Sequence, residues 1–576
     1  MNRSEVFAHY RDNPEVSVLV IGGGINGIGT FRDLALQGVD VLLVEKDDFC
    51  AGASAASSHM LHGGLRYLEN GEFRLVREAL HERNRMLKNA PHYSKPLPTT
   101  IPIFSWFSGL LNAPLKFLDL LNKPGERGAL VVKLGLTFYD WFTWSDRVMP
   151  THKFYSKKKS LELRPHLNSN IVATVTYYDA WMPYPERICL ELVLDAEAMS
   201  SQANALNYVS AEGAGANGET VILRDHLSGE TLEIKPKLVV NAAGPWIDFA
   251  NQALGKSTNF IGGTKGSHIV VDHPQLYEAT RGHEMFFEND DGRITLFFPL
   301  QDRVLIGTTD IPIDNPDDAR CTEEEIDYML TLVRKVFPTI DVKREQIVFN
   351  FSGVRPLPAS DAKTAGQISR DHSIRVTEAG NGVGFPVFSL VGGKWTTFRA
   401  FAEQTTDRVL NRLSRPRRDS TQNLAIGGGK DYPSTVNARL DWLEAVHKDT
   451  GLDRSHLSLL FERYGTRARD VATFIAAGDD ALLTHVPDGY SRREISFVVQ
   501  NEKVSHLDDF LLRRSLLAML GKLNSDGLSE IGEVVGAVLG WSYDEVQTEI
   551  ERAAEILKDQ HGVEINVNRP QTQSTD

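Results

Sequence analysis

The sequence predicts an α/β plus α protein with three parts: a Rossmann-like nucleotide-binding domain, an inserted and mainly antiparallel sheet domain, and an all-helical C-terminal domain. Three observations predict this fold class. A strand, a glycine turn, a helix and a second strand follow one another in residues 17–45, short apolar or alternating strands fill 261–360, and helical periodicity fills 433–562. A chain of 576 residues is also too long for one hydrophobic core.

The N-terminal pattern predicts a dinucleotide site. Residues 18–21 read as a buried strand, a G-x-G-x-x-G triplet begins at Gly22, a helix follows, and a second strand ends at Glu45. Gly22 allows the tight turn, Gly24 lets a pyrophosphate approach the backbone, and Gly27 lets the helix pack closely on the strand. The helix N-terminus offers N–H groups to the phosphates, and Glu45 can accept hydrogen bonds from a ribose diol.

Composition excludes several classes of function. Apolar residues make up 41% of the chain and charged residues 24%, which is typical of a soluble globular protein. The net charge of −14 makes a nucleic-acid partner improbable. The three cysteines are far apart and form no CxxC pair, so we expect a reducing cytoplasm and neither a disulfide framework nor a metal or iron–sulfur site.

Residues 101–150 are unusual for a soluble domain. The first 14 residues carry no signal-peptide pattern and no apolar run reaches 18 residues, so we expect no membrane-spanning segment. Within 101–150, however, leucines recur at helical spacing among aromatic residues, with lysines and one arginine at the edges. Two interpretations of this helical insertion stay open: a helix lying in a membrane interface, or a helical hairpin packed on the protein.

The remaining elements follow in order along the chain. A hairpin is expected over 217–234, a helix over 322–337, and two further loop-to-helix corners at 241–246 and 390–397. The predicted boundaries are a nucleotide-binding domain over 15–100, 151–260 and 361–413, the helical insertion 101–150, the antiparallel sheet domain 261–360, a Pro- and Gly-rich linker 414–432, the helical domain 433–562 and a disordered tail 563–576.

The segment after Glu45 indicates which cofactor binds. Residues 51–68 read AGASAASSHMLHGGLRYL, and such small residues let the backbone wrap a bulky ligand. A nicotinamide enzyme needs no second cradle there. A flavin does, because its ring system lies beyond the pyrophosphate and is bound along its edge.

The chain resembles the FAD-dependent glycerol-3-phosphate dehydrogenases, the aerobic respiratory family. The motifs that carry the resemblance are IGGGINGIG (21–29), SSHMLHGGLRYLENGEFRLVREAL (57–80), NAAGPW (241–246), KGSHIVV (265–271), IGTTD (306–310), SGVRPL (352–357), SRDH (369–372), VGGKWTTFR (391–399) and EKVSHLDDFLLRR (502–514). The resemblance implies a D-amino-acid-oxidase-like FAD fold and oxidation of glycerol 3-phosphate to dihydroxyacetone phosphate, with electrons passed to a membrane quinone. It also implies a cytoplasmic enzyme held peripherally at the inner face of the membrane, and it leaves a homodimer open.

The motif residues fit that chemistry. Oxidising a secondary alcohol needs a flavin N5 to take hydride, a base for the hydroxyl proton and cations for the phosphate. His268 and His62 are the candidate bases, with His268 favoured. The candidate cations and substrate ligands are Arg66, Tyr67, Lys265, Arg355, Arg370 and Lys394, of which Arg355 and Lys394 are also catalytic candidates and Tyr67 is as compatible with packing. The candidate flavin ligands are Gly22, Gly24, Asn26, Gly27, Glu45, Lys46, Ser57, Ser58, His62, Gly63, Gly64, Gly244, Trp246, Gly393 and Lys394, whereas Asp310 is set aside as a strand end.

Two departures from the family pattern leave alternatives open. Pro185-Glu186-Arg187 stands where the family usually has D-A-R, and residues 101–131 are richer in leucine and aromatics. A different polyol phosphate such as erythritol phosphate therefore remains an alternative. An oxygen-using and peroxide-forming oxidase is a further alternative, because the choice of acceptor depends on access to the reduced flavin. An amine or amino-acid oxidase on the same fold is disfavoured by the set of cations, and a non-catalytic FAD-dependent regulator or membrane scaffold is disfavoured by the histidines and cations retained in the motifs.

Overall fold

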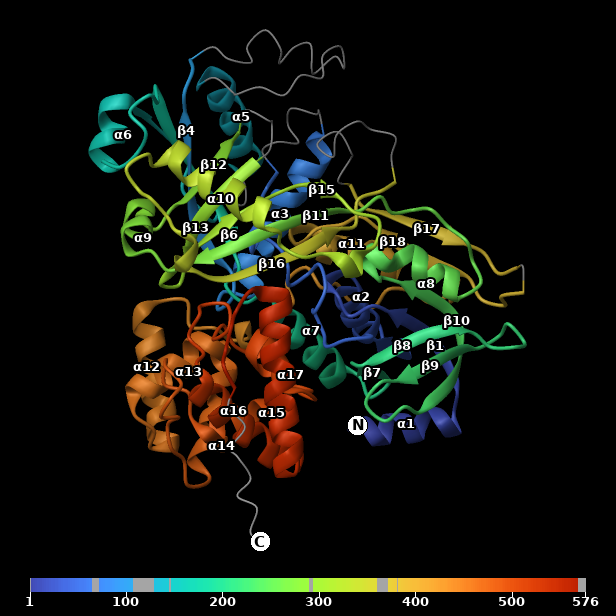
Figure 1. Ribbon diagram of the computed structural model, residues 1–576. Helices are drawn as coiled ribbons and strands as arrows, with labels where there is room; N and C mark the ends of the chain where they lie inside the picture. Colours follow the sequence, from blue (N-terminus) through green and yellow to red (C-terminus); the bar gives the residue numbers. More distant parts are fainter. Residues whose placement is uncertain are drawn as a thin grey trace.

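A computed structural model describes residues 2–64, 72–106, 129–144, 147–289, 294–359, 371–380 and 382–567. Two sheets form the larger part of the molecule, and the C-terminal helices gather beneath them (Figure 1). The predicted fold class is confirmed: a doubly covered parallel sheet, a mainly antiparallel sheet and a separate helical domain.

The first sheet carries the nucleotide-binding pattern. Its main strands lie in the order β17 (Ser373–Thr377), β18 (Val387–Val391), β10 (Thr231–Asn241), β1 (Glu15–Ile21), β2 (Val41–Val44) and β7 (Ala203–Leu206), extended through β10 by the antiparallel strands β9 (Val221–Asp225) and β8 (Val209–Ala214). The four central pairings, β18–β10, β10–β1, β1–β2 and β2–β7, are parallel. Because both faces of these strands are covered, they read as continuous apolar runs rather than as alternating patterns.

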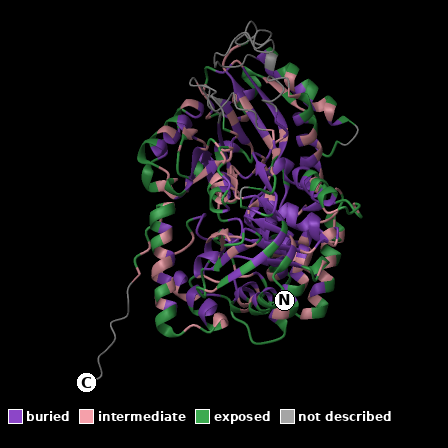
Figure 2. Cartoon of the chain, turned by 90° about the vertical axis from the view of Figure 1, so that its right-hand side faces the viewer, coloured by how far each residue is buried: buried purple, intermediate pink, exposed green. Residues whose placement is uncertain are grey.

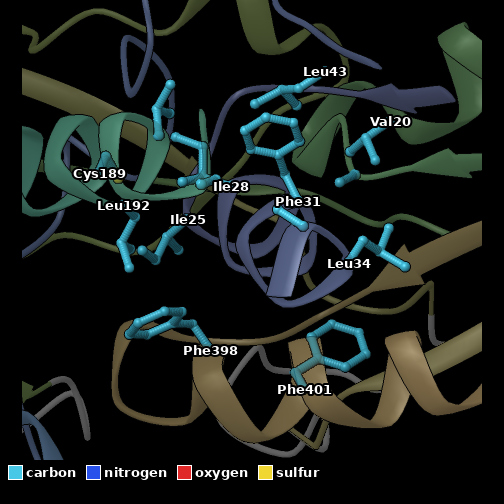
Figure 3. Close-up of a cluster of buried hydrophobic side chains, with 14 of the residues drawn as sticks. Val20, Ile25, Ile28, Phe31, Leu34, Leu43, Cys189, Leu192, Phe398 and Phe401 are labelled. Carbon is cyan, nitrogen blue, oxygen red and sulfur yellow. The ribbon is translucent and has the colours of Figure 1, made fainter. Parts of the chain in front are cut away.

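Helices cover one face of this sheet. They are α2 (Ile25–Leu36), α7 (Pro185–Met199) and α11 (Phe398–Arg412), and α1 (Arg3–Asp12) lies on the opposite side with the β8–β9 hairpin. Figure 3 shows Phe31 and Leu34 of α2 between the sheet and Phe401 of α11. This buried contact sets the position of α2, and with it the glycine turn at its N-terminus.

The second sheet is mainly antiparallel. Its order is β15 (Ile311–Pro312), β11 (Thr264–Val271), β14 (Arg303–Gly307), β13 (Ile294–Leu300), β12 (Glu284–Glu288), β4 (Lys95–Ile103), β6 (Ala173–Trp181) and β3 (Met60–Leu61), with β16 (Ile347–Arg355) beside β11 and β5 (Lys153–Ser156) beside β6. The helices α9 (Pro274–Thr280) and α10 (Glu323–Val336) share its buried core, while α3 (Phe73–Asn89) and α5 (Ala129–Phe142) pack against β4 and β6. Buried residues fill the centre of this part of the molecule (Figure 2).

This topology corrects the predicted domain boundaries. Strands β3, β4, β5 and β6 lie in segments assigned to the nucleotide-binding domain or to the insertion, yet they complete the second sheet. Their pairing partners are distant in the sequence, so local patterns do not reveal them. The insertion itself is described only at its ends, because residues 107–128 lie outside the described part of the chain.

The C-terminal helices have a core of their own. They are α12 (Val436–Thr450), α13 (Arg454–Tyr464), α14 (Ala468–Ala476), α15 (Arg492–Asn501), α16 (Ser525–Leu539) and α17 (Tyr543–His561), with a π-helical turn over Asp509–Arg514. The predicted linker 414–432 is wrong as a free connection, because Ile426 is buried in the first core and the Gly428 N–H donates to Glu191 at 3.0 Å. Of the predicted disordered tail, residues 563–567 are described, and Ile565 and Val567 pack on the C-terminal core.

Candidate functional site

The glycine turn between β1 and α2 has the geometry that the sequence predicts. Gly22 has φ +108°, and a Cβ there would lie 2.6 Å from the Ala242 carbonyl oxygen. A Cβ on Gly27 would lie 2.0 Å from the Gly22 carbonyl oxygen, so only glycine permits this contact between helix and turn. Gly24 is the N-cap of α2, whose first turn is therefore open to an anion.

Glu45 stands at the carboxyl end of β2 beside this turn. Its carboxylate accepts hydrogen bonds from the backbone N–H of Gly23 at 2.6 Å and of Asp47 at 3.0 Å. Desolvation, with the nearby Asp47, raises the pKa of Glu45 to about 7. The neighbouring Lys46 ammonium lies 4.7 Å from the centroid of the Trp246 ring. A carboxylate, a cation and an indole thus line one side of the turn, where the ribose of a dinucleotide would lie.

Ser54 is a site residue that the sequence reasoning missed. Its hydroxyl accepts a hydrogen bond from the Ile25 N–H at 3.0 Å, at the first turn of α2, and its carbonyl accepts one from the Trp395 indole at 2.8 Å. The small-residue cradle was the available signal, but composition alone does not say which serine reaches the helix.

A second corner closes over the same helix. Gly392 and Gly393 have φ of +78° and +91°, and a Cβ on Gly393 would lie 2.7 Å from Nδ2 of Asn26. Asn26 Nδ2 lies 3.4 Å from the Gly392 carbonyl, whereas its Oδ1 is buried and accepts no hydrogen bond. Lys394 is the N-cap of the short helix that leads into α11, and its Nζ is buried. A buried acceptor between two glycine-lined corners fits a ligand that brings its own donors, such as the ribityl hydroxyls or ring N–H of FAD.

The His62-Gly63-Gly64 turn is anchored from behind. The Gly63 N–H donates to Asp179 Oδ1 at 3.0 Å and to the Tyr139 hydroxyl at 3.1 Å. Arg83, itself buried, donates to the same Asp179 oxygen at 2.9 Å. The predicted role of Gly63 is therefore corrected: its N–H is held inside the protein and does not point at a cofactor. The turn also reaches the second corner, because the Thr396 hydroxyl donates to the His62 carbonyl at 3.1 Å.

His268 on β11 is the best-placed candidate base. It is buried, stacks on Phe351 with ring centroids 4.8 Å apart, and its Nε2 lies 2.8 Å from the Ser58 hydroxyl. Burial and then the charges of Arg355 and His59 hold the pKa of His268 well below 6.5, so the imidazole is neutral at physiological pH and free to accept a proton. His59, which the sequence reasoning passed over, is also buried, with its ring centroid 6.2 Å from that of Phe351.

Arg355 lies on the same face of the sheet as His268. A Cβ on Gly266, two residues before His268 on β11, would lie 2.2 Å from an Arg355 guanidinium nitrogen. The guanidinium donates to Asp310 Oδ1, to the Thr308 hydroxyl and to the Thr309 carbonyl, each at 3.1 Å. Asp310, set aside in the sequence, thus orients this cation.

Lys265 does not join this group. Side chains alternate along a strand, so Lys265 faces away from His268. Its ammonium forms a buried ion pair with Glu325 at 2.8 Å and donates to the Arg320 carbonyl at 2.5 Å. The geometry therefore argues against the predicted phosphate contact of Lys265, because its charge is already neutralised on the opposite face.

The altered Pro185-Glu186-Arg187 triplet also lies away from this group. It begins helix α7, where Arg187 forms a buried ion pair with Glu502 of the C-terminal domain at 2.8 Å. Of the other predicted residues, Ser57 accepts a hydrogen bond from the His59 N–H at 3.3 Å, and Gly64 and Gly244 have φ of +77° and +57°. Arg66, Tyr67 and Arg370 lie outside the described residues.

One short segment joins the two halves of the site. Ser54 touches the N-terminus of α2, and Ser58 touches His268. Four residues span at most about 14 Å, so the imidazole lies within one flavin-sized ligand of the phosphate-binding turn. The arrangement places a neutral base and a fixed guanidinium beside a dinucleotide cradle, which suits removal of a proton from an anionic alcohol.

Comparisons with known proteins agree with this geometry. A family model described as FAD dependent oxidoreductase matches residues 17–399, and one described as C-terminal domain of alpha-glycerophosphate oxidase matches residues 419–546. The chain is 34% identical over 573 residues to a glycerol-3-phosphate dehydrogenase of Synechocystis sp., covering 95% of this chain and 97% of that protein. It is 32% identical over 504 residues to a D-erythritol 1-phosphate dehydrogenase of Brucella abortus, covering 86% of this chain and 93% of that protein.

A solved structure has the same fold. The glycerol-3-phosphate dehydrogenase from Bacillus halodurans complexed with FAD superposes with a TM-score of 0.72 at 23% identity, covering 97% of each chain. These matches confirm the family resemblance inferred from the motifs and the expectation of FAD as cofactor.

Proposed function

Because this chain belongs to the family of FAD-dependent oxidoreductases that includes the glycerol-3-phosphate dehydrogenases, we propose that it oxidises sn-glycerol 3-phosphate to dihydroxyacetone phosphate. The observation that carries the proposal is the five-residue segment from Ser54, which contacts the N-terminus of α2, to Ser58, which contacts His268. It supports a substrate held between a bound flavin and a neutral imidazole.

The residues divide the work as follows. The glycine turn, Glu45, Asn26 and the Gly393 corner would hold FAD, whose N5 would accept the hydride from C2 of the substrate. His268 takes the hydroxyl proton at Nε2, the nitrogen on the Ser58 side, since burial keeps this imidazole neutral. Arg355, fixed by Asp310, attracts the phosphate and stabilises negative charge that develops on the reacting oxygen.

Anaerobic mixing with glycerol 3-phosphate tests this assignment. The flavin absorbance near about 450 nm should bleach in a single turnover. D-alanine and glycine should leave it unchanged, because the site offers a phosphate-binding cation rather than an amino-acid site. Bleaching by the amino acids alone, or by no polyol phosphate, would contradict the proposal.

A second substrate has specific support. The 32% identity to the D-erythritol 1-phosphate dehydrogenase of Brucella abortus is close to the 34% found for the glycerol-3-phosphate enzyme of Synechocystis sp.. Both substrates present a secondary alcohol and a phosphate, so His268 and Arg355 suit either. The ratio of the two values of kcat/KM decides between them.

We further propose that electrons pass to a quinone at the inner face of the cytoplasmic membrane, with α5 as the contact. Among the described residues no helix is both long and apolar enough to cross a bilayer. The apolar side chains Leu134, Phe138, Trp141 and Trp144 are 60%, 43%, 65% and 75% exposed and recur every three or four residues along α5 and just beyond it. Lys133 is exposed beside them, which suits an anionic lipid surface.

Pelleting with vesicles that contain an anionic phospholipid tests this contact. Replacing Leu134 and Trp141 by serine should weaken pelleting, whereas the same change at Val436 and Leu440, equally exposed on α12, should not. Equal pelleting of both variants would remove α5 as the contact. A peroxide assay with and without a quinone analogue separates the quinone enzyme from an oxygen-using oxidase.

A further inference from the structure

A cluster of buried charges joins the segment after β2 to the C-terminal domain. Asp48 is fully buried and accepts hydrogen bonds from Arg513 Nε at 2.6 Å, from Arg514 at 2.5 and 3.0 Å, and from Asn207 Nδ2 at 3.0 Å. Both arginines come from the π-helical turn Asp509–Arg514. Although burial opposes ionisation, the attraction of Arg514 and Arg513 keeps the pKa of Asp48 below its ordinary value.

The arginines are themselves fixed. Arg513 also pairs with Asp508 at 2.8 Å and Asp509 at 2.6 Å, and Arg514 donates to the Glu502 carbonyl at 2.8 Å. With these partners, each guanidinium is held in a single position. It therefore transmits the position of the C-terminal domain to the carboxylate of Asp48.

The segment that Asp48 anchors is the one that faces the glycine turn. Three residues earlier, Glu45 accepts the Gly23 N–H at 2.6 Å, and two residues later the Cys50 N–H donates to the Gly23 carbonyl at 2.9 Å. Residues 45–50 thus contact Gly23 through both its N–H and its carbonyl. The hydrogen bonds of Asp48 to the C-terminal domain fix this segment in place.

We infer that Arg513 and Arg514 are positioning residues for FAD: the C-terminal helical domain holds Asp48, and through it the 45–50 segment, in the shape that receives the adenosine half of the cofactor. The inference rests on the assignment of Glu45 and the glycine turn to FAD. According to this inference, the C-terminal domain supports the cofactor site, although none of its own groups touches the cofactor.

A matched pair of variants tests the inference. Arg514→Lys disturbs the link to Asp48, while Arg463→Lys disturbs a buried ion pair within the C-terminal domain, whose partner Glu494 lies 2.8 Å away. We expect Arg514→Lys to raise the FAD dissociation constant of the apoprotein by at least about tenfold, the effect of losing one charge-assisted hydrogen bond. Arg463→Lys should leave that constant within about twofold, even where it lowers the unfolding temperature equally.

Equal weakening of FAD binding by both variants, or none with Arg514→Lys, would overturn the inference. FAD affinity is measured without substrate, so the proposed reaction can fail while the inference stands. Hydrogen exchange of the wild-type protein provides a second measurement if the variant does not fold. FAD should slow amide exchange in residues 505–514 as well as in 45–50, and protection confined to 45–50 would equally overturn it.

Discussion

Replacing Arg355 by methionine perturbs both the substrate and the base. The change removes a positive charge at nearly constant side-chain length. In the wild-type protein the guanidinium lies over Gly266, on the face of β11 that also carries His268. Two effects follow: the phosphate loses its cation, and His268 loses a neighbour that disfavours its protonation.

The size of the second effect, the change in the pKa of His268, is set by the spacing of residues along strand β11. Residues two apart on one strand are separated by about 6.6 Å. At that distance two unit charges repel by about 2.5 kcal/mol at an effective dielectric constant of about 20. Asp310, 3.1 Å from the guanidinium, cancels part of this repulsion. We therefore expect the pKa of His268 to rise when Arg355 is replaced by methionine.

Stopped-flow flavin reduction across pH measures both effects. In the wild type the acid limb of the rate should lie well below pH 6.5, the ordinary pKa of histidine, because the base is lost only when His268 becomes protonated. In Arg355→Met the limb should move to higher pH, and kcat/KM should fall by about tenfold to a hundredfold as charge-assisted hydrogen bonds are lost. Arg355→Lys keeps the charge and should leave the limb in place while raising KM. An unmoved limb together with undiminished kcat/KM in the flavin-loaded methionine variant would refute the reasoning.

Two further outcomes are expected. Tyr139→Phe removes a hydrogen bond to Gly63 and should slow flavin reduction by about tenfold while FAD stays bound. The same change at the neighbouring buried Tyr177 should leave the rate of flavin reduction unchanged. Equal rates in the two variants would show that the Tyr139 hydroxyl does not position the Gly63 turn. Burial raises the pKa of Glu284 from 4.5 to about 8, so its contribution to stability is complete below pH 4.5 and is lost as pH rises toward 8. Between about pH 5 and about pH 8 the wild type should lose about 3 kcal/mol of unfolding free energy, which Glu284→Gln should retain. Urea unfolding measures this difference, with the exposed Glu278→Gln as the control variant. The same pH dependence in both variants would exclude Glu284 as its source.

The sequence predicts the β1–α2–β2 unit of the first sheet well because its determinants are local. Gly22, Gly27 and Glu45 meet one another within one strand–helix–strand unit, so spacing alone fixes their neighbours. The strand pairing of the second sheet cannot be predicted in this way. Strand β4 pairs with β6 through Lys95 and Trp181, and with β12 on its other side, and no local pattern reports contacts between segments so far apart.

Lys265 and Arg355 show the same limit at the site. Both are cations in family motifs and candidate substrate ligands, although only Arg355 is also a catalytic candidate. Strand alternation already places Lys265 opposite to His268, but only the structure shows that Glu325 neutralises it there. Arg355 is also paired, with Asp310, yet that pair lies at the partly exposed edge on the His268 face. The residue type is thus predictable, whereas the partner that determines its role is not.

Two buried carboxylates complete this picture, because each fixes one turn of the site from outside it. Asp179 holds the Gly63 N–H, and Asp48 holds the segment around Gly23. Breaking a buried charge pair on one side leaves an uncompensated charge, so both are costly to replace and neither tolerates a loose geometry. Their effects should nonetheless separate: a change at Asp48 acts on retention of FAD, and a change behind Gly63 acts on the rate with which bound FAD is reduced. This separation follows from what each carboxylate holds: Asp48 fixes the segment beside the glycine turn, whereas Asp179 fixes the Gly63 turn that follows Ser58 in the chain.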